Sequence, residues 1–134
     1  MTKALIAVVD DDPSIVKSLA RLLGWAGYKV ATFGSAKEFL DSLATAVPEC
    51  LVLDVQMPEM GGLEMESRLQ ERGHQLPVIF ITAHDTPQTR TAATRSERMT
   101  LLFKPFGNAA LLAAVGKALL PTALPTRRSV TTSA

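Results

Sequence analysis

The sequence has few of the features that mark secreted, membrane or nucleic-acid-binding proteins. Its 134 residues include one cysteine, Cys50, so no internal disulfide can form, which is typical of a reducing compartment. The 14 lysine and arginine residues nearly balance 13 aspartate and glutamate residues, and this gives no electrostatic reason to expect nucleic acid or membrane as a direct partner. The apolar run before Asp10, residues 4–9, is too short for a signal peptide or membrane span. We therefore expect a cytoplasmic protein.

Short apolar runs alternate with longer amphipathic segments over most of the chain, and there is no internal repeat. The expected strands cover residues 5–9, 28–33, 51–54, 76–82 and 99–103, and the expected helices cover 13–26, 35–46, 63–72, 87–95 and 109–120. This alternation predicts an α/β fold with a parallel sheet covered on both faces. Residues 121–134 hold two prolines and no apolar periodicity. We expect one domain over 1–120, followed by a flexible tail or linker.

Local signals indicate where several helices begin and end. Asp12 is a good N-cap because Pro13 follows at the first helical position, and Gly27 can end that helix. Ser35 with Glu38 three residues later forms a capping-box pattern. Trp25 is expected to pack at the end of the first helix.

Polar side chains close four of the expected strands. Asp10 and Asp11 follow the first strand, Asp54 ends the third, and Thr82 and Lys104 end the fourth and fifth. In open parallel sheets, ligands bind outside the carboxyl ends of the strands, where the strand order reverses. If the order is the flavodoxin-like 2-1-3-4-5, the first and third strands are neighbours at that point. One pocket would then hold three carboxylates, a hydroxyl and an ammonium group.

Clustered carboxylates repel one another, so a fold that assembles them favours a bound cation. Oxygen ligands without histidine or thiolate suit Mg²⁺. A magnesium ion with a lysine and a hydroxyl can bind a phosphoryl group, and one carboxylate could be its acceptor through an aspartyl phosphate. Asp54 is the best candidate, because Asp10 and Asp11 form a natural metal-holding pair.

Four segments, "VVDDDPS", "LVLDVQMPEMGGLE", "PVIFITAH" and "FKPF", resemble the receiver domain of two-component response regulators in order and spacing. The resemblance covers residues 3 to about 120. The phrases "GYKVATFGSAKEFL" and "PVIFITAHDT" look most like receivers of nitrogen-fixation-type transcription regulators. The resemblance implies a flavodoxin-like (βα)5 fold with strand order 2-1-3-4-5. It also implies a phosphorylation-dependent signalling switch that is not a metabolic enzyme.

By the same resemblance, Asp54 accepts the phosphoryl group from a sensor histidine kinase. Asp11 and Asp54 would ligate Mg²⁺ directly, Asp10 would help through water, and the backbone carbonyl of Gln56 would be a further ligand.

Thr82 would supply the hydroxyl that moves to the phosphate, and Lys104 would pair with it, with a cis bond between Lys104 and Pro105. Receivers usually carry an aromatic residue three positions before this lysine, whereas Leu101 occupies that position here. The stretch 94–100, "TRSERMT", also lacks the glycine usual before the fifth strand. The coupling between hydroxyl and aromatic residue is therefore open, and the end of the fourth helix is expected to be irregular.

The last expected helix, "NAALLAAVGKALL", has one charged residue, Lys117, and apolar residues on more than one side. An exposed apolar face commonly marks a partner surface. We expect a homodimer or effector contact on the face formed by the fourth helix, the fifth strand and the fifth helix. The alternative is an alanine-rich face that only meets solvent. The candidate contact residues are Leu101, Leu112, Val115 and Leu119.

Three other functions fit part of the pattern. A degenerate receiver would act by protein contact without phosphorylation. A haloacid-dehalogenase-type phosphohydrolase would use the D-x-D of Asp10 and Asp12, but it needs acidic ligands late in the chain, and no carboxylate side chain follows Glu97. An FMN carrier would share the topology, but no phosphate-binding loop follows the first strand. Whether the chain works alone or as part of a longer regulator stays open.

Overall fold

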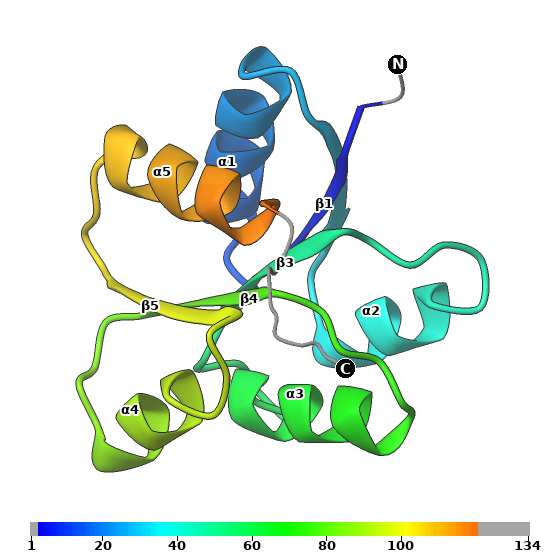
Figure 1. The fold of residues 1–134 in the computed structure, drawn as a ribbon, viewed down its shortest axis with the longest axis vertical. Coiled ribbons are helices and arrows are strands. Elements are labelled where there is room, and N and C mark those ends of the chain that lie inside the picture. Colours follow the sequence, from blue (N-terminus) through cyan, green and yellow to red (C-terminus); the bar gives the residue numbers. More distant parts are fainter. Residues whose placement is uncertain (1–2, 121–134) are drawn as a thin grey trace, which may run out of the picture.

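The computed structural model describes residues 3–120, which form a five-stranded parallel sheet in the order β2-β1-β3-β4-β5 (Figure 1). Strands and helices alternate, as β1 (Leu5–Val9), α1 (Pro13–Trp25), β2 (Lys29–Phe33), α2 (Ala36–Ser42), β3 (Cys50–Asp54), α3 (Gly62–Glu71), β4 (Val78–Thr82), α4 (Pro87–Ala93), β5 (Met99–Phe103) and α5 (Asn108–Ala118). The predicted fold class and strand order are confirmed. The tail predicted at 121–134 lies outside the described residues.

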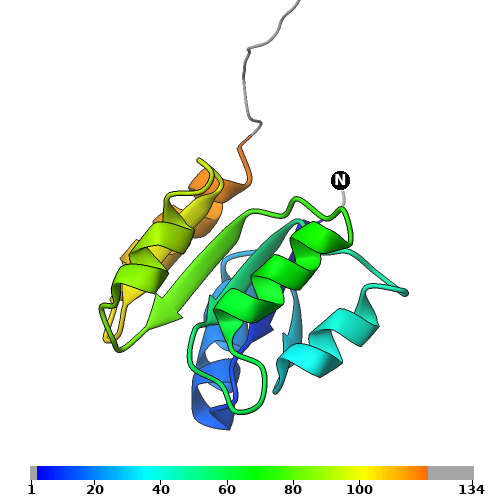
Figure 2. The same ribbon diagram turned by 90° about the horizontal axis from the view of Figure 1, so that it is seen from below.

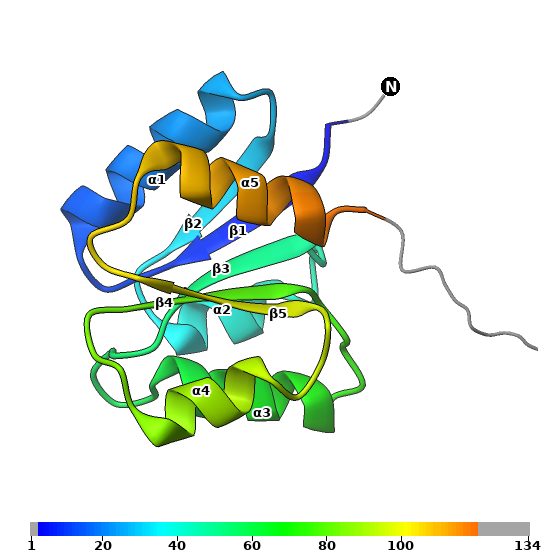
Figure 3. The same ribbon diagram turned by 60° about the vertical axis from the view of Figure 1, so that its left-hand side comes forward.

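Two helices cover one face of the sheet and three cover the other. Helices α1 and α5 lie on one side, and α2, α3 and α4 lie on the opposite side (Figures 1 and 3). Figure 2 shows α2, α3 and α4 arranged as a layer along the sheet. Over residues 3–120, no helix combines the length and the apolar character that a membrane crossing would need.

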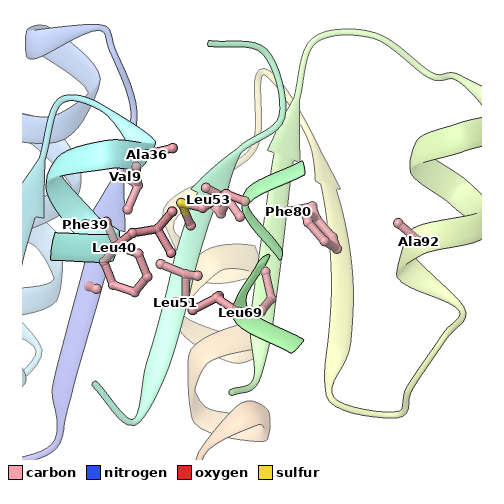
Figure 4. Packing of buried hydrophobic residues seen from close by; sticks show 12 residues of the cluster. Val9, Ala36, Phe39, Leu40, Leu51, Leu53, Leu69, Phe80 and Ala92 are labelled. Carbon is pink, nitrogen blue, oxygen red and sulfur yellow. The ribbon is translucent and has the colours of Figure 1, made fainter. Parts of the chain in front are cut away.

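The central strands are buried on both faces, which explains their nearly continuous apolar sequences. On one face Val8, Val52 and Ile79 lie side by side across three strands and pack against α1 and α5. On the other face Leu51 and Phe80 pack with Phe39 of α2 and with residues of α3 and α4 (Figure 4). Alternate residues therefore serve two separate cores, and the sheet is packed between them.

The predicted helix starts are present. Asp12 caps α1 by accepting a hydrogen bond from the backbone N–H of Ser14 at 2.9 Å. Ser35 caps α2 by accepting from the N–H of Glu38 at 3.2 Å, and its hydroxyl donates to the Glu38 carboxylate at 3.3 Å. Gly27 has φ 102°, so it turns the chain after α1 as expected.

The end of α2 was predicted four residues too late. The helix ends at Ser42 instead of Ala46, because the Ser42 hydroxyl donates to the carbonyl of Phe39 at 2.6 Å and the next turns tighten. Thr45 donates to the carbonyl of Ser42 at 2.9 Å, a bond over three residues. The other predicted boundaries agree with the structure within two residues.

Two predictions of side-chain packing are wrong. Trp25 is 85% exposed, because the last turn of α1 carries it away from the stripe that contains Leu19 and Leu23. Val115 was proposed as a contact residue, but it is fully buried against the sheet together with Leu111. The branched residues of α5 face inward and leave an exposed face of alanines with Lys117, formed by Ala109, Ala110 and Ala113. The alternative of an alanine-rich solvent face thus describes much of this helix.

The loop between β3 and α3 contains one strained residue. Glu59 has φ 68°, the left-handed region that costs an L-residue roughly 1–2 kcal/mol.

We expect Glu59→Gly to raise the free energy of unfolding by about 1 kcal/mol in urea titrations, since glycine adopts this φ without strain. Glu97→Gly is the control, because Glu97 is exposed and has no positive φ. Equal effects of the two substitutions would show that Glu59 is not strained.

Candidate functional site

The structure brings the five polar strand-end residues to one edge of the sheet. Asp10 follows β1, Asp54 ends β3, and these strands are neighbours with Val9 opposite Leu53. Thr82 ends β4, and Lys104 follows β5 and donates its backbone N–H to the carbonyl of Thr82 at 2.8 Å. The parallel register therefore places residues far apart in sequence around one position outside the carboxyl ends of the strands.

Three carboxylates meet at this edge. One oxygen each from Asp10, Asp11 and Asp54 lies within 4.8 Å of the other two. Asp10 and Asp54 are buried, at 1% and 4% exposure, whereas Asp11 is exposed. Burial and the negative charge of Asp10 raise the pKa of Asp54 from its ordinary value near 3.8 to about 6, against the opposing effect of Lys104. The cluster therefore concentrates negative charge where water is largely excluded.

Lys104 offsets part of this charge. Its Nζ lies 3.3 Å from Oδ2 of Asp10 and 3.4 Å from Oδ1 of Asp54, so the ammonium group stands between the two buried carboxylates. Its side chain is 24% exposed, so the ammonium group is also accessible from solvent. The peptide bond between Lys104 and Pro105 is cis, as the sequence resemblance implied.

The two oxygens of Asp54 differ in their surroundings. Oδ1 contacts Lys104 and accepts a long hydrogen bond from the backbone N–H of Gln56 at 3.5 Å. Oδ2 accepts no hydrogen bond from any residue between 3 and 120. Buried carboxylate oxygens are normally bonded, so an unbonded one suits a ligand or a reacting atom. Oδ1 of Asp10, by contrast, accepts from the N–H of Asp12 at 2.9 Å.

The donor set fits a hard divalent cation. The cluster offers the oxygens of three carboxylates, two of them buried and one exposed, and it includes neither histidine nor thiolate. Oxygen ligands of this kind are those that Mg²⁺ takes in proteins. Gln56 lies two residues after Asp54 in an exposed loop, close enough in the chain for its carbonyl to be considered a further ligand. Its ligand role stays a prediction.

Thr82 is fully buried, and its hydroxyl is bonded within its own turn. Oγ1 accepts a hydrogen bond from the N–H of His84 at 3.0 Å and donates to the carbonyl of His84 at 3.2 Å. The sheet register puts the preceding residue, Ile81, opposite Asp54. Thr82 thus stands beside the acidic cluster, and its O–H must leave the carbonyl of His84 before it can donate a hydrogen bond to another group there.

Gly61 and Gly62 shape the site, although neither was among the site residues predicted from the sequence. A Cβ atom on Gly62 would overlap the carbonyl oxygen of Asp54, and one on Gly61 would lie 2.9 Å from the carbonyl oxygen of Val55. The start of α3 therefore presses directly against the backbone of Asp54. The paired glycines after an aspartate and a proline were a visible signal of this close approach.

Comparison with known proteins agrees with this geometry. Residues 6–116 match a family described as the response regulator receiver domain. Nodulation protein W of Bradyrhizobium diazoefficiens is 43% identical over 115 residues, which are 85% of this chain and 50% of that protein. Transcriptional regulatory protein TdiR of Thauera aromatica is 41% identical over 114 residues, again 85% of this chain and 50% of that protein. The chain spans about half the length of these curated relatives.

A solved structure gives the same result for the fold. A response regulator receiver protein from Burkholderia phymatum superposes with a TM-score of 0.76 and 39% sequence identity, covering 91% of this chain and all of that one. The family model covers most of the chain, and the relatives exceed 30% identity over more than four fifths of it. The chain therefore belongs to the response regulator receiver domain family, as its sequence predicted.

Proposed function

We propose that Asp54 is the phosphoacceptor of this domain, and that a sensor histidine kinase supplies the phosphoryl group in a reaction that requires Mg²⁺. Receiver domains of response regulators act as switches in two-component signalling. The observation that carries the proposal is the unbonded oxygen Oδ2 of a buried Asp54, placed beside two further carboxylates and an ammonium group. This arrangement supplies a nucleophile, oxygen ligands for a cation and a positive charge at one edge of the sheet.

The proposed transfer uses this chain's residues as follows. Oδ2 of Asp54 forms a bond to phosphorus while the bond between phosphorus and the imidazole nitrogen of the kinase histidine breaks, and that imidazole keeps the electron pair. Asp10, Asp11, Asp54 and the carbonyl of Gln56 would hold Mg²⁺, which when bound neutralises the phosphoryl oxygens. Lys104 would contribute a second positive charge from its place between two carboxylates.

After transfer, the Thr82 hydroxyl would leave the carbonyl of His84 and bind a phosphoryl oxygen. Its present bonds to His84 join this movement to the loop that leads into α4. We propose that phosphorylation changes the conformation of the face formed by α4, β5 and α5, and that this face then controls a partner or a second copy of the chain. Leu101, Leu112 and Leu119 are partly buried there and remain candidate contact residues. The cytoplasm stays the predicted compartment.

The proposal predicts a strict metal requirement. Incubation with acetyl phosphate and Mg²⁺ is expected to add one phosphoryl group to the wild-type protein, measured by intact mass, and an excess of EDTA is expected to abolish the gain. The reason is that three clustered carboxylates repel an incoming phosphoryl group unless a cation offsets their charge.

A gain that persists in EDTA would contradict the role of the metal. No gain at any magnesium concentration would instead favour the degenerate receiver, which acts through protein contact without phosphorylation. Continued release of phosphate from a phosphomonoester, dependent on Asp10 and Asp12 but not on Asp54, would favour the phosphohydrolase.

A further inference from the structure

An ion pair with one buried member, outside the acidic cluster, joins α3 to the segment that follows α4. Glu66 of α3 is 2% exposed, and its Oε1 lies 3.0 Å from Nη1 of Arg95, two residues beyond the end of α4. Its second oxygen, Oε2, accepts a hydrogen bond from the side-chain amide of Gln70, one turn further along α3. A buried carboxylate is costly unless it is paired and hydrogen-bonded, so both partners are needed for this packing.

The two helices joined by this pair differ in how firmly the core holds them. Helix α3 buries Met65 and Leu69 almost completely in the cluster under the sheet. Helix α4 has only seven residues, and its buried residues are Thr89 and Ala92, both small. Hydrophobic stabilisation follows the apolar area that is buried, so packing alone holds α4 weakly. The two helices lie side by side on the same face of the sheet (Figures 1 and 3).

Other attachments of α4 are exposed to solvent. Arg90 pairs with Asp85 in the loop before the helix, and its guanidinium carbon lies 5.3 Å from the centre of the Phe103 ring. Both side chains of that pair are more than half exposed, so solvent screens it. By contrast, the pair of Glu66 and Arg95 has a buried member, and it lies at the C-terminal end of the helix.

The N-terminal end of α4 is connected to Thr82, which lies beside the acidic cluster. The hydroxyl of Thr82 binds both backbone groups of His84, and two residues later Thr86 caps α4 by accepting from the N–H of Thr89 at 3.1 Å. A movement of the Thr82 hydroxyl therefore reaches α4 at its first turn. The last turn is held by a separate contact to a different helix.

We propose that Glu66 is a positioning residue which, through Arg95, holds the C-terminal end of α4, so that α4 turns about that end when Thr82 moves. The proposal rests on the proposed function, because phosphorylation of Asp54 is what moves Thr82. The proposal places the largest displacement at the first turn of α4 and keeps the last turn and the start of β5 in place.

The test begins with the unphosphorylated protein and measures amide hydrogen exchange by NMR. In Glu66→Gln and in Arg95→Gln, the amides of Thr94 and Arg95 are expected to exchange roughly tenfold faster than in the wild type, equivalent to about 1.4 kcal/mol of local stability. Glu64→Gln is the matched control, because it removes the exposed pair of Glu64 and Arg68 on the same helix. Arg95→Lys keeps a cation for Glu66 and is expected to retain slow exchange.

Unchanged exchange at Thr94 and Arg95 in Arg95→Gln, or an equal change in Glu64→Gln, would overturn the proposal. Arg95 is nearly half exposed, so its replacement tests the contact even if Glu66→Gln fails to fold. Unchanged exchange in α5 shows that the rest of the fold is intact.

The second stage adds acetyl phosphate and Mg²⁺. In the wild type, exchange is expected to change between Thr86 and Arg90 and to stay constant at Thr94 and Arg95. In Arg95→Gln the change is expected to extend through the last turn. A wild-type change that spans the whole helix would contradict a held end. Intact mass of the same samples reports phosphorylation separately, so absence of a phosphoryl group would count against the proposed function while the first stage still decides the role of Glu66.

Discussion

Replacing Asp54 with asparagine is expected to raise the free energy of unfolding of the metal-free protein by about 3 kcal/mol at pH 7. In the folded protein, burial and the nearby charge of Asp10 raise the pKa of Asp54 to about 6, whereas the ordinary value is near 3.8. The folded state therefore binds this proton more tightly than the unfolded chain does. At neutral pH the carboxylate is charged in both states, and its charge costs stability in the fold.

Because the pKa of Asp54 is higher in the folded protein than in the unfolded chain, the destabilisation by its charge increases with pH. The destabilisation is absent below about pH 4, where Asp54 is protonated in both states. It grows between pH 4 and 6 and is complete above pH 6, so the advantage of Asp54→Asn should follow the same course. Urea unfolding in EDTA at several pH values measures it.

Asp11→Asn is the control, because Asp11 belongs to the same cluster but is exposed. Solvent screens its charge, so a smaller gain is expected. Magnesium should stabilise the wild type more than Asp54→Asn, since a ligand of the folded state shifts unfolding by mass action. A gain for Asp54→Asn that is as large at pH 4 as at pH 7 would show that charge burial is not its cause.

Gly62→Ala is expected to lower the free energy of unfolding by about 3 kcal/mol. The new Cβ would overlap the carbonyl oxygen of Asp54, which is backbone and cannot rotate away. The backbone N–H of Gly62 donates to the carbonyl of Val55 at 2.9 Å, which holds the start of α3 against the residues that follow β3. Relief of the overlap must therefore either displace the end of β3 at Asp54 or break this hydrogen bond.

Gly116→Ala provides the matched control within a helix. A Cβ on Gly116 meets nothing within 4 Å, and alanine is favoured over glycine in a helix by roughly 1 kcal/mol. Urea unfolding should therefore move in opposite directions for the two substitutions. A neutral Gly62→Ala would mean that the loop after Asp54 shifts easily, and the close approach would then not constrain the site.

The sequence was most informative where a local pattern determines a global arrangement. Nearly continuous apolar runs indicated strands that are buried on both faces of a parallel sheet. In such a sheet, the residues at the carboxyl ends of the strands meet at one edge. The proximity of Asp54 and Lys104 could therefore be predicted from their positions at strand ends. The distance between them, the unbonded oxygen of Asp54 and its raised pKa depend on side-chain positions and burial, which the strand pattern does not contain.

The missed features depend on side-chain contacts, either within one helix or between elements. The end of α2 depends on a serine hydroxyl that competes with the backbone. The buried position of Val115 follows from how α5 rotates on the sheet, which its nearly uniform apolar sequence could not define. Glu66 did leave a signal, because it lies on the stripe of α3 with Met65 and Leu69. A glutamate on such a stripe implies a distant partner, but only the fold identifies it as Arg95.

The residue that carries the phosphoryl group can be identified directly by chemical trapping. The protein is incubated with acetyl phosphate and Mg²⁺ and reduced with borohydride, which converts an aspartyl phosphate to homoserine, and its peptides are sequenced by mass spectrometry. Homoserine is expected at position 54 in the wild type, with no phosphoryl gain in Asp54→Asn. Homoserine at position 10 or 11, or an undiminished gain in Asp54→Asn, would contradict the assignment of Asp54 as the acceptor.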